Sequence, residues 1–208
     1  MPALKGSLTY TRFYVDGKMP PKFAERFFEA IQHETMRPLE PDDDAPERSG
    51  WARIGEPFEL NLDYESVFVD QYINLSMRTD KWVIPAPMLR AKLREAEATY
   101  LEKKQRERLS RKEKTELKEV VARKLRKQLT PTTRSVDLSW SLDEKVVRFF
   151  SQAVPPAVVM EDLFTRTFGL KLIRETPYTL AARLGLTDAQ ESTWDAIDAT
   201  SLLTAENV

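Results

Sequence analysis

The longest uninterrupted helix-forming stretch of this sequence lies between two groups of prolines. Pro85 and Pro87 are placed as in a helix start, and no further proline occurs until Pro131. Proline disrupts helix interiors, so its absence permits a long helix here. The intervening residues are rich in Ala, Leu, Glu, Lys and Arg, which favour helix.

Two apolar stripes indicate how these helical residues pack. The first stripe has spacings of four, three and four residues, so its members share one helix face: Leu89, Leu93, Ala96 and Tyr100. The second repeats the pattern with Leu117, Val120 or Val121, Leu125, and Gln128 or Leu129.

A helix boundary is predicted between the two stripes. Ser110 followed by Glu113 matches the S-x-x-E capping box, which favours a new helix start. We therefore expect two antiparallel helices, roughly Ala86 to Leu109 and Arg111 to Leu129, packed along their apolar stripes. One continuous helix of more than forty residues is the alternative.

The net charge of −1 conceals a strong segregation of charge along the chain. Residues 1–80 carry −6, residues 81–130 carry +9, and residues 131–208 carry −4. A local field, more than net charge, concentrates an oppositely charged partner. The basic part coincides with the predicted helix pair.

The strongest positive charge falls where the apolar stripes fade. Residues 103–114 carry a net charge of +5, and Leu109 is their single large apolar residue. Pairs spaced by four, such as Glu102 with Arg106, account for only part of this charge. The excess favours phosphate contact, and the lack of aromatic residues predicts contact with the nucleic-acid backbone without base stacking. The expected principal contacts are Lys103, Lys104, Arg106, Arg108, Arg111, Lys112 and Lys114.

A second basic cluster ends the second predicted helix. Its members are Arg123, Lys124, Arg126 and Lys127. They are candidate secondary phosphate contacts. They are equally consistent with cations that stabilise the negative end of a helix dipole.

The flanking sequence predicts an antiparallel sheet with packed helices. Alternation of apolar and polar residues predicts strands at 6–15, 66–78 and 135–142, with a hairpin return at 145–150 and a short closing strand at 170–175. Apolar periodicity predicts a helix at 22–32, and prolines at the start with Gly169 as a stop predict a helix at 155–169. We expect an α+β fold with a projecting antiparallel two-helix finger. The body comprises residues 1–84 and 131–175, the finger residues 85–130, and an acidic, partly ordered tail residues 176–208, with a short helix around Trp194.

Composition excludes several classes of chemistry. The chain has no cysteine and one histidine, His33, so cysteine-ligated metals and histidine clusters are excluded. Asp42 to Asp44 are interpreted as a solvated loop within 37–50, and Asp143 to Lys145 as a hairpin turn. No glycine-rich phosphate loop, signal peptide or membrane-spanning run is evident. We expect a cytoplasmic, non-catalytic protein without cofactor, metal, membrane or small-molecule substrate.

The order of elements resembles the RdgC family of recombination-associated DNA-binding proteins. The similarity lies in "SGWARIGEP", "FVDQYINLSMR", "IPAPMLRAKLREAEA", "KKQRERLSRKEKTELKEVV" and "SVDLSWSLDEKVVRFFSQAVPPAVVMEDLFTRTFG". It implies non-sequence-specific DNA binding in recombination or replication, to duplex more than to single strands, by a nucleoid-associated homo-oligomer. Family members form dimeric rings around duplex DNA. The chain is similar to a short member that lacks the C-terminal part.

Charge segregation also permits a different function. The acidic ends of one copy can meet the basic helix pair of the next, which would make this chain an assembly module that self-associates or docks on a larger complex. Both hypotheses place the functional surface on the charged helix pair.

Overall fold

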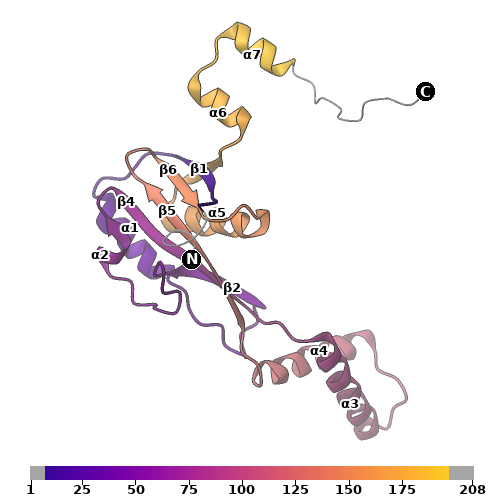
Figure 1. The fold of residues 1–208 in the computed structure, drawn as a ribbon. Coiled ribbons are helices and arrows are strands. Elements are labelled where there is room, and N and C mark those ends of the chain that lie inside the picture. Colours follow the sequence, from indigo (N-terminus) through magenta and orange to yellow (C-terminus); the bar gives the residue numbers. More distant parts are fainter. Residues whose placement is uncertain (1–7, 197–208) are drawn as a thin grey trace, which may run out of the picture.

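The computed structural model describes residues 8–196. Its elements follow one another as β1 (Thr11–Asp16), α1 (Phe23–His33), β2 (Glu47–Ala52), α2 (Tyr64–Val67), β3 (Phe68–Val69), β4 (Tyr72–Lys81), α3 (Ala86–Lys104), α4 (Arg111–Arg126), β5 (Thr132–Ser141), β6 (Val146–Phe149), α5 (Val154–Phe168), β7 (Lys171–Arg174), α6 (Pro177–Leu184) and α7 (Asp188–Asp195) (Figure 1). Mixed helix and antiparallel sheet confirm the predicted α+β class.

Seven strands form one sheet in which every strand pair is antiparallel. The order is β2-β4-β5-β6-β1-β7, and β3 pairs with β4. The longest pairing joins β4 to β5, from Tyr72 opposite Ser141 to Lys81 opposite Thr132. These two strands lead directly into α3 and out of α4, so the helix pair is inserted between neighbouring strands.

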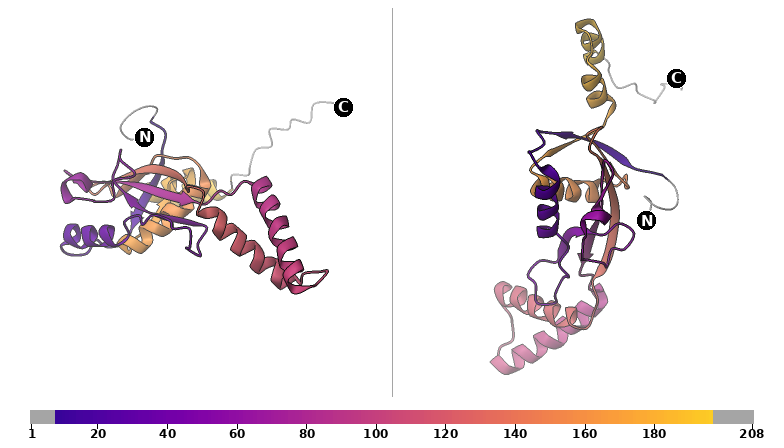
Figure 2. Two further views of the ribbon diagram at one scale, coloured as in Figure 1. Left: turned by 90° about the horizontal axis from the view of Figure 1, so that it is seen from below. Right: turned by 90° about the vertical axis from the view of Figure 1, so that its left-hand side faces the viewer.

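The core lies between one face of the sheet and helices α1 and α5 (Figure 2). Phe27 from α1 and Phe164 and Phe168 from α5 surround the ring of Trp140 on β5, and their ring centroids lie 5.1–5.6 Å from that of Trp140. The predicted periodicity of α1 therefore identified its buried face. A buried hydrogen bond of 2.8 Å from Trp51 Nε1 to the Thr167 hydroxyl ties β2 to α5.

The predicted single strand over residues 66–78 is wrong. A turn at Asp70 and Gln71 divides it into β3 and β4, and α2 precedes β3. Asp70 adopts a left-handed conformation (φ 51°), which Asp tolerates better than most residues. Val69 consequently leaves the expected apolar face and is exposed, whereas Ile73 is fully buried.

The predicted exposed connection over residues 37–50 is wrong at its C-terminal end, where β2 begins at Glu47. This strand lacks apolar alternation and is recognised only through its pairing with β4. Gly50 is required there because a Cβ atom would lie 2.6 Å from the backbone of Met36. Leu39 within the same connection is buried.

Other predicted elements agree with the structure. The hairpin of β5 and β6 forms, α5 begins with a proline in its first turn, and Gly169 ends it in the left-handed conformation (φ 68°). Strand β7 and a helix around Trp194, α7, are also present. The predicted strand 6–15 is observed only from Thr11, as β1; residues 8–10 are not in a strand, and residues 6–7 lie outside the described residues. Helix α6 was not predicted.

Candidate nucleic-acid interface

Helices α3 and α4 pack against each other beyond the end of strands β4 and β5 (Figures 1 and 2). A buried polar cluster holds the two strands where the helices begin. Arg78 Nη2 lies 2.6 Å from Asp80 Oδ2, and Arg78 Nε donates to the other carboxylate oxygen at 2.9 Å. The Thr133 hydroxyl on β5 donates to the same carboxylate at 2.7 Å. This cluster positions the root of the helix pair.

The junction between the helices is capped as the sequence predicted. The Ser110 hydroxyl accepts a hydrogen bond from the Glu113 amide at 3.3 Å, and the Glu113 carboxylate accepts one from the Ser110 amide at 2.8 Å. Both bonds of the capping box are therefore formed. The pKa of Glu113 is lowered, mainly by the hydrogen bond that its carboxylate accepts from the Ser110 amide. The pKa of Tyr100 is raised, mainly because its hydroxyl donates a hydrogen bond to Glu113.

Both helices are shorter than predicted. Helix α3 ends at Lys104 instead of Leu109, because Gln105 adopts a left-handed conformation (φ 49°) that caps it. Helix α4 ends at Arg126, three residues before Leu129. Residues 105–110 therefore form a loop that joins the helices, and Arg106 and Arg108 extend from that loop and not from a helix.

The seven predicted principal contacts gather around this loop, and all are exposed. Arg106 pairs with Glu113 at 3.3 Å, and Lys112 pairs with Glu116 at 3.9 Å. Within residues 8–196, the other five make no ion pair: Lys103, Lys104, Arg108, Arg111 and Lys114. The end of the helix pair thus presents positive charge that the described protein does not neutralise.

The helix dipoles stabilise some of these cations and destabilise others. Lys103 and Lys104 lie in the last turn of α3, where a helix dipole favours cations. Arg111 and Lys112 lie in the first turn of α4, where the same dipole disfavours them. Helix stability therefore accounts for a cation at Lys103 and Lys104, but not for one at Arg111 or Lys112.

The second basic cluster is brought against the acidic loop that sequence reasoning interpreted as solvated. Lys127 Nζ lies 3.1 Å from Asp42, and Arg123 Nη2 lies 3.5 Å from Asp44. Arg126 is half-buried and donates to the main-chain carbonyl of Asp43 at 2.8 Å. Within the described residues, neither Lys124 nor Arg126 makes an ion pair.

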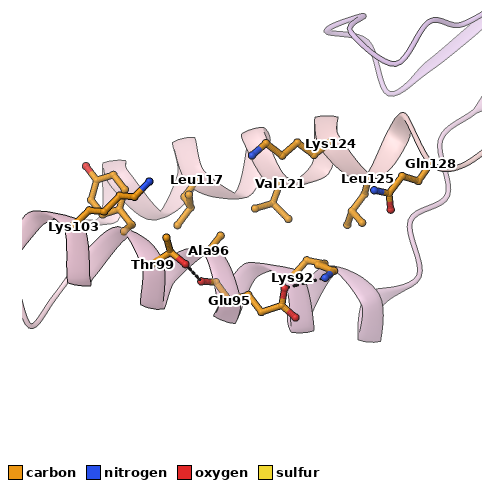
Figure 3. Close-up of a pocket in the computed structure, with 11 residues that line it drawn as sticks. Lys92, Glu95, Ala96, Thr99, Lys103, Leu117, Val121, Lys124, Leu125 and Gln128 are labelled. Atoms are coloured by element: carbon orange, nitrogen blue, oxygen red, sulfur yellow. Dashed lines mark hydrogen bonds and ion pairs between the residues drawn. The ribbon is translucent and has the colours of Figure 1, made fainter.

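The interface between the helices contains an open groove of about 470 Å³ (Figure 3). Leu117, Val121 and Leu125 from α4 point toward α3 in this view. Ala96 and Tyr100 line the opposite side, and no residue of α3 is buried. The predicted apolar stripes thus face each other without closing the space between them.

The other charged residues that could have formed a catalytic or metal site contact neighbouring residues or form a turn. Glu144 pairs with Arg148 across the β5–β6 turn, and Lys145 has the positive φ (54°) of a turn residue. His33 is exposed beside Glu34. In the part of the chain that the structure describes, no three His, Cys, Asp or Glu side chains gather as metal ligands would, and no helix is long and apolar enough to cross a membrane.

The fold and the site define an α+β protein with a basic helix pair inserted between two paired strands of its sheet. A family model described as "Putative exonuclease, RdgC" matches residues 12–147, from β1 into β6 and including both helices. The match covers more than half of the sequence, and the chain therefore belongs to the RdgC family. No curated protein matches the chain.

Proposed function

We propose that this protein binds DNA through the backbone phosphates, without sequence preference and without catalysis, in recombination or replication. The observation that carries the proposal is a set of five exposed cations at the end of the helix pair that make no ion pair within residues 8–196: Lys103, Lys104, Arg108, Arg111 and Lys114. Membership of the RdgC family supports the same function.

The electrostatics of α4 support a ligand of negative charge. Arg111 and Lys112 repel the positive end of their own helix dipole. An anion placed there would be attracted by both side chains and by the dipole. No aromatic residue lies between Tyr100 and Trp140, so base stacking has no platform here, and contact is with phosphates.

We also propose that the ligand is duplex DNA and that the protein acts as an oligomer. A pair of helices with cations at its end suits the regularly spaced phosphates of a duplex better than a flexible single strand. The acting form is a homo-oligomer located at the nucleoid. RdgC family membership supports the location at the nucleoid.

A salt titration of DNA binding tests the proposal. Changing Lys104, Arg108 and Arg111 to Gln should weaken binding to duplexes of any sequence by about 10²-fold, and it should reduce the slope of log K against log salt by about 2.7, or 0.9 for each phosphate contact. The matched control changes Lys18, Arg26 and Lys171 to Gln. These three residues are exposed, lie outside the helix pair and make no ion pair with the described residues.

Equal loss in both triple variants would show that net charge alone drives binding. An unchanged affinity in the first variant would overturn the proposal. Because the family description names an exonuclease, end-labelled duplex should also be incubated with the protein and Mg²⁺. The proposal predicts that the labelled strand keeps its length.

A further inference from the structure

The groove between α3 and α4 has the features of a docking surface. Its apolar side chains are Ala96, Leu117, Val121 and Leu125. Lys92, Lys103 and Lys124 also line it. Lys92 is paired with Glu95 at 2.9 Å, but Lys103 and Lys124 make no ion pair among the described residues. An occupant should therefore be apolar and acidic.

The C-terminal helices α6 and α7 have the complementary character. Helix α6 buries none of its residues, and Tyr178 and Leu184 are 61% and 75% exposed. Arg183 is the last basic residue of the sequence, and five acidic residues follow it. Of these, Asp188 and Glu191 lie on α7, exposed and without an ion pair in the described structure.

The two helices form a defined unit and not a featureless tail. The rings of Tyr178 and Trp194 lie 6.5 Å apart, which joins α6 to α7. Arg183 stacks 3.9 Å from the ring of Tyr14 on β1, which joins α6 to the sheet. Threonine capping boxes begin both helices. The unit can therefore present apolar and acidic side chains together.

The groove and the C-terminal helices lie at opposite ends of the molecule. Figure 1 shows α6 and α7 beyond one end of the sheet and α3 and α4 beyond the other, and the right-hand view of Figure 2 agrees. Only two residues separate β7 from α6, which leaves α6 close to the sheet. The helices of one copy cannot reach the groove of the same copy.

We propose that α6 and α7 of one copy dock into the α3–α4 groove of a second copy. Leu180 (38% exposed) and Leu184 are four residues apart on one face of α6 and would fill the apolar groove, and Asp188 and Glu191 would pair with Lys103 and Lys124. This is recognition of an amphipathic helix by a groove, with charges that set its orientation. The inference does not depend on DNA binding.

Such an interface is heterologous, since each copy donates helices at one end and accepts them at the other. A heterologous contact does not close on itself in a dimer, so copies add head to tail. Sedimentation velocity should show a mass that grows with protein concentration beyond the dimer. Added salt should reduce this growth, because salt screens the lysine–carboxylate pairs.

One variant disrupts the docking helices and another disrupts the groove. Leu184→Glu adds a charge to an exposed position of α6 and should weaken self-association by at least about tenfold. Ala96→Glu places a carboxylate inside the groove, retains a good helix former and should have the same effect. Lys124→Glu serves as a second groove variant, and circular dichroism verifies the fold of each.

Mixing the two variants gives the decisive result. Leu184→Glu protein retains a working groove, and Ala96→Glu protein retains working C-terminal helices, so an equimolar mixture should form a dimer of one copy each and nothing larger. A monomeric parent protein, a variant that assembles like the parent, or a mixture that stays monomeric would each overturn the inference. The loss of DNA binding on changing Lys104, Arg108 and Arg111 to Gln is measured separately and bears only on the proposed function.

Discussion

Lys127 Nζ lies 3.1 Å from the carboxylate of Asp42, a residue 85 positions earlier in the chain. The neighbouring Arg123 and Asp44 are paired at 3.5 Å. The acidic loop thus occupies the surface of the second basic cluster that phosphates would otherwise contact. If DNA binds as proposed, its phosphates compete with these carboxylates for Arg123 and Lys127.

Removing the two carboxylates should strengthen DNA binding. Exposed pairs of this kind contribute about 0.2–1 kcal/mol each, so Asp42→Asn with Asp44→Asn should tighten binding by about two- to thirtyfold and steepen its salt dependence. Fluorescence anisotropy with a labelled duplex at several salt concentrations measures both effects.

The matched control for this change is Glu65→Gln with Asp70→Asn. It removes the same charge from α2 and the β3–β4 turn, at the opposite end of β4 from the helix pair. Asn tolerates the left-handed conformation of residue 70. If the control tightens binding equally, the acidic loop has no specific effect on Arg123 and Lys127.

Loss of the capping hydroxyl should open the start of α4. Ser110→Ala removes the acceptor of the Glu113 amide and should cost about 1 kcal/mol. Amide hydrogen exchange in the first turn of α4 should accelerate about fivefold, the same energy expressed as a ratio. Thr115→Ala is the control, because that hydroxyl bonds only back to the Arg111 carbonyl at 3.1 Å. Equal exchange in both variants would contradict the capping role.

Acid should weaken the same junction through Glu113. The pKa of Glu113 is lowered in the folded chain, mainly by the hydrogen bond from the Ser110 amide. Its stabilising effect is therefore complete above the ordinary pKa of 4.5 and is lost as pH falls through the lower folded value. Amide exchange at Ser110, corrected for its intrinsic pH dependence, should show a loss of protection below pH 4.5.

Glu113→Gln tests the origin of that loss. The glutamine oxygen can still accept from the Ser110 amide, but its side chain does not titrate. Protection of Ser110 in this variant should change little over the same pH interval. A loss equal to that of the parent chain would assign the acid effect to another group.

Removing Asp80 should destabilise the whole fold. The side chains of Arg78 and Asp80 are 8% and 1% exposed, so Asp80→Ala leaves a buried guanidinium without its carboxylate. The expected loss in the free energy of unfolding is about 3–5 kcal/mol, measured by urea denaturation. The control Lys81→Ala breaks an exposed pair with Glu47 and should cost less than about 1 kcal/mol. A small loss for both would show that the Arg78–Asp80 pair does not hold the strands at the root of the helix pair.

Patterns spanning a few residues predicted much of this structure. Ser110 and Glu113 are three positions apart, and the bonds of a capping box depend only on that spacing. Gly169 ended α5 for a similarly local reason, because a left-handed cap suits glycine. The spacing of Phe27 and Ile31 identified the buried face of α1. Strand β2 was missed because Gly50 and its neighbours carry no alternation.

The sequence by itself determined the helix pair, its capped junction and the concentration of cations around that junction, since each depends on residues near one another in the chain. Only the tertiary structure decided which cations keep their charge unpaired. The partners of Lys127 and Arg123 lie about eighty positions away, and no local spacing records such a contact. The same holds for the groove and for α6 and α7, whose placement at opposite ends follows from how β4, β5 and β7 pair in the sheet.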